Sequence, residues 1–403
     1  MPSTRRTLLK SLGATSVSVA VAGCSLLSRL SGPDEPPPSG VDEMPDPEDS
    51  ARGANGEWST FGCNAANTRE VGDGKAPVDG VAERWRAEVP QLTYRAPVVA
   101  GGRVYQPEVD TLRVLDAADG SELWTAEGVE RVPLVWNGVA YVSTGAVIRA
   151  LEADTGEQLW EREFETPGVV TAPSTRAGEQ LVCGVGERVV ALDSDDGTVR
   201  WDREVFGQIQ DHPAVFMAHW FVITTRAGMV YLLDRDGMGG HRWQLPAEPT
   251  APPSVDTDSV YVNCRNGTTY ALMDDGLSDP TRHWAADTGW ADRGIAVADG
   301  LVLVANGQAL HAVDTESGDR PWEYEVGDWR HTAPAYGRDT VFVGGDRLRA
   351  LDPTPGDSPD GGPAVRFERE FGGRVGPGPV LDDGTIYVVA QVDDETYALL
   401  ALD

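Results

Sequence analysis

The chain has 403 residues, of which 40% are hydrophobic and 7% aromatic, and it carries 64 acidic residues against 33 lysines and arginines. The net charge of −31 leaves no basic footprint for a nucleic-acid backbone, so nucleic-acid binding is excluded as a function. A surface this acidic repels itself unless salt screens it, which favours adaptation to a saline habitat over recruitment of a cationic partner.

The N-terminus has the features of an export signal. Arg5 and Arg6 precede an apolar run over 12–23 that is too short for a conventional transmembrane helix. A basic start, a short apolar segment and small residues before a cleavage site are typical of a signal peptide. The paired arginines resemble a twin-arginine signal, which implies export of an already folded protein. Removing residues 1–23 leaves 30 basic and 64 acidic residues, a net charge of −34.

The segment that follows predicts a membrane-anchored tether. Val21-Ala22-Gly23-Cys24 resembles a lipobox, which implies that Cys24 becomes the lipidated first residue on the extracytoplasmic face of the cell membrane. An ordinary cysteine at the end of an apolar anchor is the alternative. Residues 24–57 combine prolines with acidic and small residues, a composition that cannot form a core and behaves as a flexible linker.

A sequence repeat governs the remainder of the chain. A tryptophan returns at intervals of 36 to 42 residues, and a phenylalanine takes the next place 45 residues on. The positions are Trp85, Trp124, Trp160, Trp201, Trp243, Trp284, Trp322 and Phe367. Self-similarity at this period is typical of propellers and solenoids.

Each repeat has the same order of features. The first copy has a proline-containing segment at 95–99, an alternating strand at 103–105, the pair Leu115-Asp116 and a turn closing on Gly120 before the tryptophan strand. Four short strands per repeat of about 40 residues predict a β-propeller blade. Helical periodicity is absent throughout.

The two ends of the repeat region predict how the ring closes. The last unit stops at Asp403 after three strands, without a tryptophan strand. The first tryptophan strand, at 83–86, has no three strands before it. We therefore predict an all-β, eight-bladed propeller over 58–403 whose last four-stranded antiparallel blade is completed by this N-terminal strand. Such closure removes exposed sheet edges.

The recurring Asp and Gly residues admit a second interpretation as calcium loops. The sequence from Asp193 to Gly197 is the closest to such a loop, but its glycine comes one place too early for the EF-hand pattern. We interpret these turns as hairpins, in which Asp and Gly tolerate positive φ. We expect the tryptophans to pack between blades rather than to form a ligand cage, because they occupy equivalent positions.

The cysteines give no metal or redox site. Besides Cys24, they are Cys63, Cys183 and Cys264, and none has the short spacing of a zinc or redox pair. Cys183 and Cys264 fall in predicted strands two blades apart, so we expect buried, small apolar side chains. The six histidines are dispersed, which argues against a His-rich metal site.

The turn glycine, the tryptophan strand and the Ala-Leu-Asp before the turn resemble the PQQ-like repeats of the quinoprotein dehydrogenase superfamily over essentially all of 58–403. The segment 58–68, which contains W-x-x-F-G-x-x-x-x-N-T, looks like the lead-in of such proteins. Together with the lipobox and the acidic composition, the chain is similar to PQQ-repeat propellers of halophilic archaea and to BamB-type assembly lipoproteins.

The resemblance does not by itself imply an enzyme. The dehydrogenases of this superfamily are much longer, and they have an adjacent cysteine pair over the quinone, calcium ligands and an aspartate base. No Cys-Cys pair occurs here, and no catalytic position can be transferred. We therefore expect no catalytic residues, no metal and no cofactor, with PQQ and calcium as the alternative.

The first strand of each blade lines the channel of a propeller, so residues at its start face the funnel mouth. Alignment on the proline gives Arg95, Arg131, Thr171, Asp211, Thr250, Arg293 and Thr332 as equivalent positions. The predicted ligand- or partner-binding residues are Arg95, Arg131, Asp211, His212, Trp290, Arg293, Trp329, Arg330, His331 and Arg374. Arginine suits anionic or carboxylate-bearing ligands, and tryptophan suits stacking. Alternatively, these arginines only neutralise carboxylates of the same ring.

Three functions remain open at this point. The first is a monomeric, lipid-anchored scaffold at the cell surface that binds partner proteins. The second is a receptor that holds a small or anionic ligand in the funnel. The third is a reduced quinoprotein that oxidises alcohols or sugars.

Overall fold

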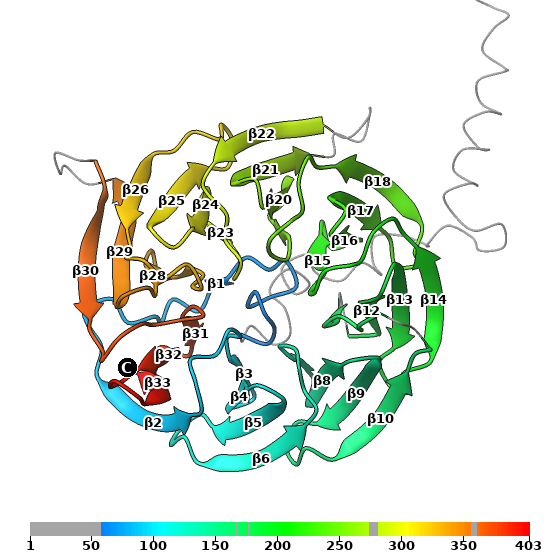
Figure 1. Cartoon of the computed structure of the whole chain (residues 1–403), viewed down its shortest axis with the longest axis horizontal. Helices are drawn as coiled ribbons and strands as arrows, with labels where there is room; N and C mark the ends of the chain where they lie inside the picture. Colours follow the sequence, from blue (N-terminus) through cyan, green and yellow to red (C-terminus); the bar gives the residue numbers. More distant parts are fainter. Residues whose placement is uncertain (1–57, 166–167, 176–177, 274–280, 356–360) are drawn as a thin grey trace, which may run out of the picture. The chain divides into compact units, whose positions relative to one another are not determined.

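The computed structural model describes residues 58–165, 168–175, 178–273, 281–355 and 361–403. These residues form strands and turns, arranged as a ring (Figure 1). Within these ranges no helix is long and apolar enough to cross a membrane. The predicted signal peptide, the lipobox and the linker lie outside the described residues.

Eight separate sheets make up the ring, and each contains a blade of four antiparallel strands, as the repeat predicted. Blades 1 and 2 contain β3 (Val98–Ala100), β4 (Arg103–Pro107), β5 (Thr111–Asp116), β6 (Glu122–Glu127), β7 (Leu134–Trp136), β8 (Val139–Thr144), β9 (Val147–Glu152) and β10 (Gln158–Glu163). Blades 3 and 4 contain β11 (Ser174–Thr175), β12 (Gln180–Val185), β13 (Arg188–Asp193), β14 (Val199–Glu204), β15 (Ala214–Phe216), β16 (Trp220–Thr224), β17 (Met229–Leu233) and β18 (Gly239–Gln244).

The second half of the ring repeats the arrangement. Blades 5 and 6 contain β19 (Ser254–Val255), β20 (Ser259–Asn263), β21 (Thr268–Met273), β22 (Thr281–Asp287), β23 (Ala296–Ala298), β24 (Leu301–Ala305), β25 (Ala309–Asp314) and β26 (Trp322–Glu325). Blades 7 and 8 contain β27 (Ala335–Gly337), β28 (Val341–Val343), β29 (Leu348–Pro355), β30 (Pro363–Arg369), β31 (Val380–Asp382), β32 (Thr385–Gln391) and β33 (Tyr397–Leu402).

The eighth blade is completed from the other end of the chain. Strand β2 (Glu83–Val89) pairs antiparallel with β33, with Glu83 opposite Leu402 and Val89 opposite Tyr397. Blade 8 therefore has the order β2-β33-β32-β31, and the predicted closure is confirmed. Figure 1 shows the blue β2 strand lying outside the red strands of the C-terminus.

The repeated tryptophans join neighbouring blades, as expected. Six indole N–H groups donate to a backbone carbonyl of the next blade, near the end of its third strand or in the turn that follows, over 2.6–3.0 Å. The donors are Trp85, Trp124, Trp160, Trp201, Trp284 and Trp322, and the acceptors are Ala117, Ala153, Ser194, Arg235, Thr315 and Pro353. Phe367 occupies the equivalent place on β30, opposite Ala350.

The turn glycine of the next blade lies against the same indole ring. Gly120, for example, has φ of 74°, and a Cβ at that position would lie 2.6 Å from the ring of Trp85. Glycine is the one residue that satisfies both the left-handed backbone and the close approach. This contact explains why the glycine and the tryptophan recur together in the sequence.

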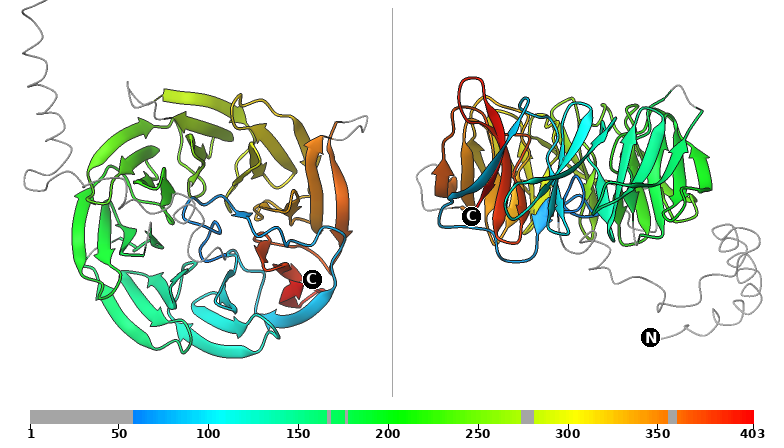
Figure 2. Two further views of the ribbon diagram at one scale, coloured as in Figure 1. Left: turned by 180° about the vertical axis from the view of Figure 1, so that it is seen from behind. Right: turned by 90° about the horizontal axis from the view of Figure 1, so that it is seen from below.

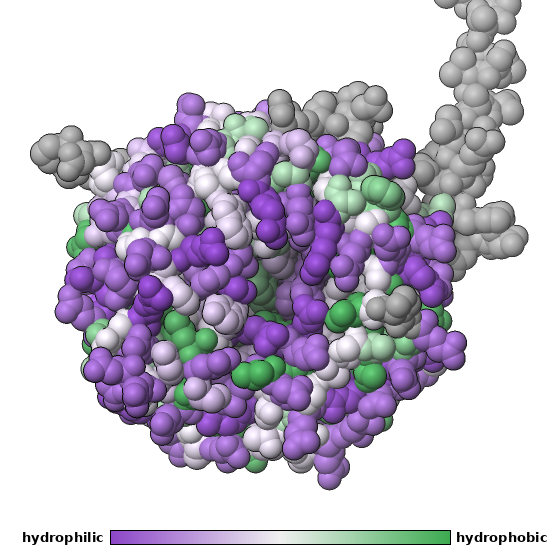
Figure 3. Space-filling view, in the orientation of Figure 1, coloured by the Kyte–Doolittle hydropathy of each residue, from purple (hydrophilic) through white to green (hydrophobic). Residues whose placement is uncertain are grey.

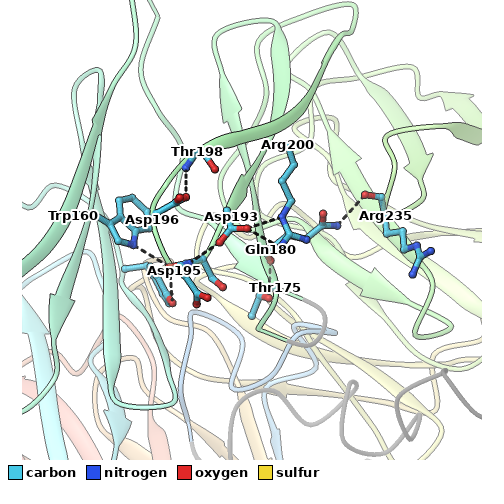
Figure 4. A network of polar contacts seen from close by, with 11 residues as sticks. Trp160, Thr175, Gln180, Asp193, Asp195, Asp196, Thr198, Arg200 and Arg235 are labelled. Carbon is cyan, nitrogen blue, oxygen red and sulfur yellow. Dashed lines mark hydrogen bonds and ion pairs between the residues drawn. The ribbon is translucent and has the colours of Figure 1, made fainter.

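The aspartates that precede these turns accept backbone hydrogen bonds. In the turn between β13 and β14, Asp193 accepts from the N–H of Asp195 at 2.9 Å and pairs with the guanidinium of Arg200 at 2.8 Å (Figure 4). Asp196 accepts from the N–H of Thr198 in the same turn. The hairpin interpretation of these aspartates agrees with this geometry, because their oxygens stabilise the turn itself.

A lead-in segment, residues 58–71, runs around the inside of the ring. Its backbone carbonyls accept hydrogen bonds from the first strands of six blades, from the N–H groups of Val99, Val135, Val215, Val255, Val297 and Tyr336. It ends in strand β1 (Glu70–Val71), which pairs in parallel with β27. The side view in Figure 2 shows this dark-blue segment toward one face of the ring. The motif noted at 58–68 therefore closes the central channel.

The cysteines of the ring are buried. Cys183 lies in β12 and Cys264 directly follows β20, and neither side chain is exposed. Burial raises the pKa of both thiols to about 12, which keeps them protonated and unreactive. Their interpretation as small core residues is confirmed. Cys63 is also buried, within the lead-in.

Candidate functional site

The residues at the start of the first strands line one cavity at the centre of the ring. Six of the seven aligned positions contribute to its wall, and the cavity has a volume of about 590 Å³. They are Arg95, Arg131, Thr171, Asp211, Thr250 and Arg293. Thr332, the seventh, is fully buried. Figure 3 shows the hollow at the centre of this face, surrounded by hydrophilic residues.

The cavity is a blind funnel because the lead-in closes its lower end. Each mouth arginine is four residues before a first-strand N–H that binds the lead-in, as Arg95 is before Val99. The lead-in therefore lies deeper in the ring than the mouth residues. Phe61 of the lead-in reaches the cavity and stacks on His212, with ring centroids 5.0 Å apart.

His212 was predicted at the mouth, and the structure places it at the floor instead, where it is buried. Its Nδ1 atom has no hydrogen-bond partner among the described residues. Burial lowers the pKa of His212 from 6.5 to about 4, against the opposing effect of Asp211. The imidazole is therefore neutral at physiological pH.

On one side of the mouth, a carboxylate ties three blades together. Asp211, before blade 4, pairs with Nη1 of Arg131, before blade 2, over 2.6 Å. The other oxygen of Asp211 accepts a hydrogen bond from the N–H of Ala172, which leads into blade 3. Arg131 thus has a structural role, as the neutralisation hypothesis predicted for the ring arginines.

On the opposite side, four residues form a second cluster. Asp292 accepts a hydrogen bond from the ring nitrogen Nδ1 of His331 at 2.8 Å and pairs with Arg293 at 3.3 Å. The guanidinium of Arg293 stacks over the ring of Tyr94, 5.1 Å from its centroid. Tyr94 belongs to blade 1 and the other residues to blades 6 and 7, so this cluster links blades across the mouth.

The remaining predicted residues form a rim of stacked cations and aromatics. Arg330 lies over Trp290 at 4.7 Å, and Arg374 lies over Trp329 at 4.6 Å. Trp290 lines the cavity, whereas Trp329, Arg330, His331 and Arg374 lie beside it rather than in its wall. The ten predicted residues therefore divide into six in the wall or floor and four on the rim.

Sequence reasoning missed a second set of wall residues. Arg226 and Arg265 come from the turns between the second and third strands of blades 4 and 5, and both line the cavity. Glu248 and Asp292 also line it, and Glu248 pairs with Arg265 at 3.2 Å. The repeat pattern could have predicted them, because in an antiparallel blade the turn between the second and third strands lies on the same face as the start of the first strand.

The charges of the cavity wall are opposite in sign to those of the whole chain. Five arginines and three carboxylates line it, giving a net charge of +2 in a chain of −31. Arg131, Arg265 and Arg293 each pair with one of these carboxylates. Among the described residues, Arg95 and Arg226 have no carboxylate partner. Burial lowers the pKa of Arg95, with the nearby Arg131 adding to the effect and Asp211 and Glu130 opposing it.

The described part of the chain contains no cluster of three or more His, Cys, Asp or Glu side chains placed to hold a metal ion. The functional groups of the funnel are instead guanidinium groups, aromatic rings and the neutral imidazole of His212. This set can bind anions by bidentate hydrogen bonds and can stack on planar groups.

The neutral state of His212 gives a testable dependence of stability on pH. Its native pKa of about 4 lies below the ordinary value of 6.5, so the unfolded chain binds the proton more tightly. This contribution to stability is complete above pH 6.5 and is lost as the pH falls toward 4, by up to about 1.4 kcal/mol per pH unit. Urea unfolding at constant salt should show a shallower decline for His212→Gln between pH 6.5 and 5. Parallel declines in the two proteins would contradict this assignment.

The fold and the cavity define a class: an eight-bladed β-propeller with a blind, cationic funnel at its axis. Within that class, the chain belongs to the family described as outer membrane protein assembly factor BamB, whose model matches residues 78–273 and 276–359. The resemblance to PQQ-like propellers is thereby confirmed. No curated protein matches the sequence significantly.

Solved structures share the fold at low identity. BamB from Moraxella catarrhalis aligns with a TM-score of 0.60 and 15% identity, covering 80% of this chain and 97% of that one. Quinohemoprotein alcohol dehydrogenase from Comamonas testosteroni aligns with a TM-score of 0.69 and 15% identity, covering 91% and 82%. A europium-containing methanol dehydrogenase aligns with a TM-score of 0.62 and 14% identity, covering 87% and 90%. At such identities the likeness shows the fold alone, and the fold is shared by assembly factors and dehydrogenases.

Proposed function

We propose that this protein is an exported, lipid-anchored and non-catalytic scaffold, which binds a partner protein through the funnel face of its propeller. The observation that carries the proposal is the blind funnel, whose wall is net positive in a strongly acidic chain. A closed floor suits docking rather than passage through the ring. The family description, an assembly factor, supports a protein as the partner.

Site-specific crosslinking in intact cells tests this proposal. A photo-reactive amino acid at Tyr94, 50% exposed on the funnel face, is expected to capture a partner protein. The same group at Leu159, 55% exposed on the outer strand of blade 2, is the matched control and is expected to capture none. Equal capture from both positions, or capture from Leu159 alone, would refute docking at the funnel.

The arginines of the two mouth clusters should matter for this docking. Arg131→Ala and Arg293→Ala each remove the cationic partner of a wall carboxylate, so we expect about tenfold weaker partner binding for each. Affinity measurement with the captured partner checks this, and Arg162→Ala, on exposed β10, serves as the control. Unchanged affinity in both mouth variants would count against the proposal.

A PQQ-dependent dehydrogenase would behave differently in a simple titration. Absorbance titration of the purified protein with PQQ and calcium in high salt is expected to show no stoichiometric uptake, because the adjacent cysteine pair of those enzymes does not occur in this sequence. Tight uptake with reduction of an electron-accepting dye would overturn the scaffold function.

A further inference from the structure

The arginines of the funnel face fall into two groups that differ in their partners. Arg131, Arg265, Arg293 and Arg374 pair with Asp211, Glu248, Asp292 and Asp328, respectively. Among the described residues, Arg95, Arg226 and Arg330 pair with no carboxylate. The first group is explained by the ring itself, and the second group is not.

The two uncompensated arginines of the wall have different settings. One amino group of Arg95 donates to the backbone carbonyl of Glu108 at 3.1 Å, which holds the guanidinium in place without pairing it with a carboxylate. Arg226 is exposed at the turn between β16 and β17, and its side chain makes no ion pair within the described residues. Both line the same cavity.

The positions of these two arginines in the ring place them on different sides of the funnel. Arg95 precedes blade 1 and Arg226 belongs to blade 4, three blades away in a ring of eight. Both guanidinium groups line one cavity of about 590 Å³, so a ligand with one anionic group for each wall can pair with both.

The floor between the two walls offers a further polar contact. The Nδ1 atom of His212 is buried, lacks a partner among the described residues, and belongs to a residue that lines the cavity. A buried polar atom without a partner costs free energy that a bound ligand can recover. The aromatic rings of Phe61, Tyr94 and Trp290 provide apolar contact beside these polar groups.

We infer that the funnel recognises an acidic peptide segment that carries two carboxylates, one bound by Arg95 and the other by Arg226. This inference rests on the proposed function and specifies which element of the partner protein enters the funnel. The charge complementarity, the blind floor and the family of assembly factors favour a peptide loop as the ligand. The outer arginine Arg330, stacked on Trp290, lies where the segment would leave the mouth.

Binding of short fluorescent peptides to the full-length protein tests the inference. The probes are a Gly/Ser peptide with two separated glutamates, the same peptide with one glutamate, and the same peptide with two glutamines. Each charge-assisted contact should raise the affinity about tenfold. The wild type should therefore bind the peptide with two glutamates about tenfold more tightly than the peptide with one. Arg95→Gln and Arg226→Gln should each abolish this preference, while Arg162→Gln, on the outer strand β10, should retain it.

Several outcomes would overturn the inference. A preference for two glutamates that persists in both Arg95→Gln and Arg226→Gln would exclude these anchors, provided urea unfolding shows that the variants are folded. Displacement by free glutarate at lower concentration than by peptide would assign the site to small dicarboxylates instead. Failure of every peptide to bind, with partner capture from Tyr94 intact, would refute this inference and leave the proposed function standing.

Discussion

Replacement of Arg69 by methionine is expected to lower the free energy of unfolding by about 3–5 kcal/mol. Arg69 is 1% exposed, and its guanidinium donates to the carbonyls of Pro334, Phe61 and Pro379 at 2.7, 3.0 and 3.1 Å. It also stacks on Trp58, 4.9 Å from the ring centroid. Methionine would fill much of the volume but leave three buried carbonyls without donors, so the lead-in would detach from blades 7 and 8.

Urea unfolding in high salt, followed by tryptophan fluorescence, measures this effect. Burial lowers the pKa of Arg69 to about 10, so the side chain remains charged at neutral pH and the loss is not a titration effect. Arg69→Lys keeps the charge but has a single nitrogen, and it should lie between the wild type and Arg69→Met. The exposed control Arg162→Met should change stability by less than about 0.5 kcal/mol. A similarly small change for Arg69→Met would show that the lead-in is not anchored by this residue.

The second large effect is expected at the seam where the ring closes. Trp85 is 7% exposed, donates its indole N–H to the carbonyl of Ala117 at 2.9 Å, and covers Gly120 of blade 1. Trp85→Ala should cost about 3–5 kcal/mol, as expected for removal of a buried aromatic side chain. Because β2 would be loosened from β33, the edge of β33 would become available for pairing with other chains.

Two measurements distinguish opening of the β2–β33 pairing from the general loss of stability that follows removal of any buried side chain. Size-exclusion chromatography should show oligomers for Trp85→Ala, and less so for Trp201→Ala, whose strand β14 is continuous with its own blade. Leu159→Ala, 55% exposed on β10, should resemble the wild type in both assays. If Trp85→Ala remains monomeric and unfolds like Leu159→Ala, the seam has no special role in stability.

The repeat made most of the fold predictable from the sequence. The tryptophans recur at similar spacing, and each is followed by a glycine in the next unit. This pattern reflects one packing contact that is repeated around the ring, as between Trp85 and Gly120. The incomplete last unit indicated closure by β2, since a propeller with an open blade would expose sheet edges. The lead-in was recognised as a motif, but its position in the channel was not predictable because its contacts are backbone hydrogen bonds.

The site was less predictable than the fold. Alignment of the first strands found Arg95, Arg131 and Arg293, because strand position decides which residues face the channel. It could not separate Arg131, which pairs with Asp211, from Arg95, which has no carboxylate partner among the described residues. Arg131 and Asp211 are 80 positions apart in the sequence. Their ion pair forms only because the ring brings their blades together, so no local sequence pattern predicts it.

The pairing of β2 with β33 also sets an order of events during protein synthesis. Strand β2 leaves the ribosome long before its partner β33 has been translated. The first tryptophan strand must therefore wait, unpaired, until the ribosome has passed β33. A truncation that removes β33 would thus damage the first strand of the ring as much as the last one.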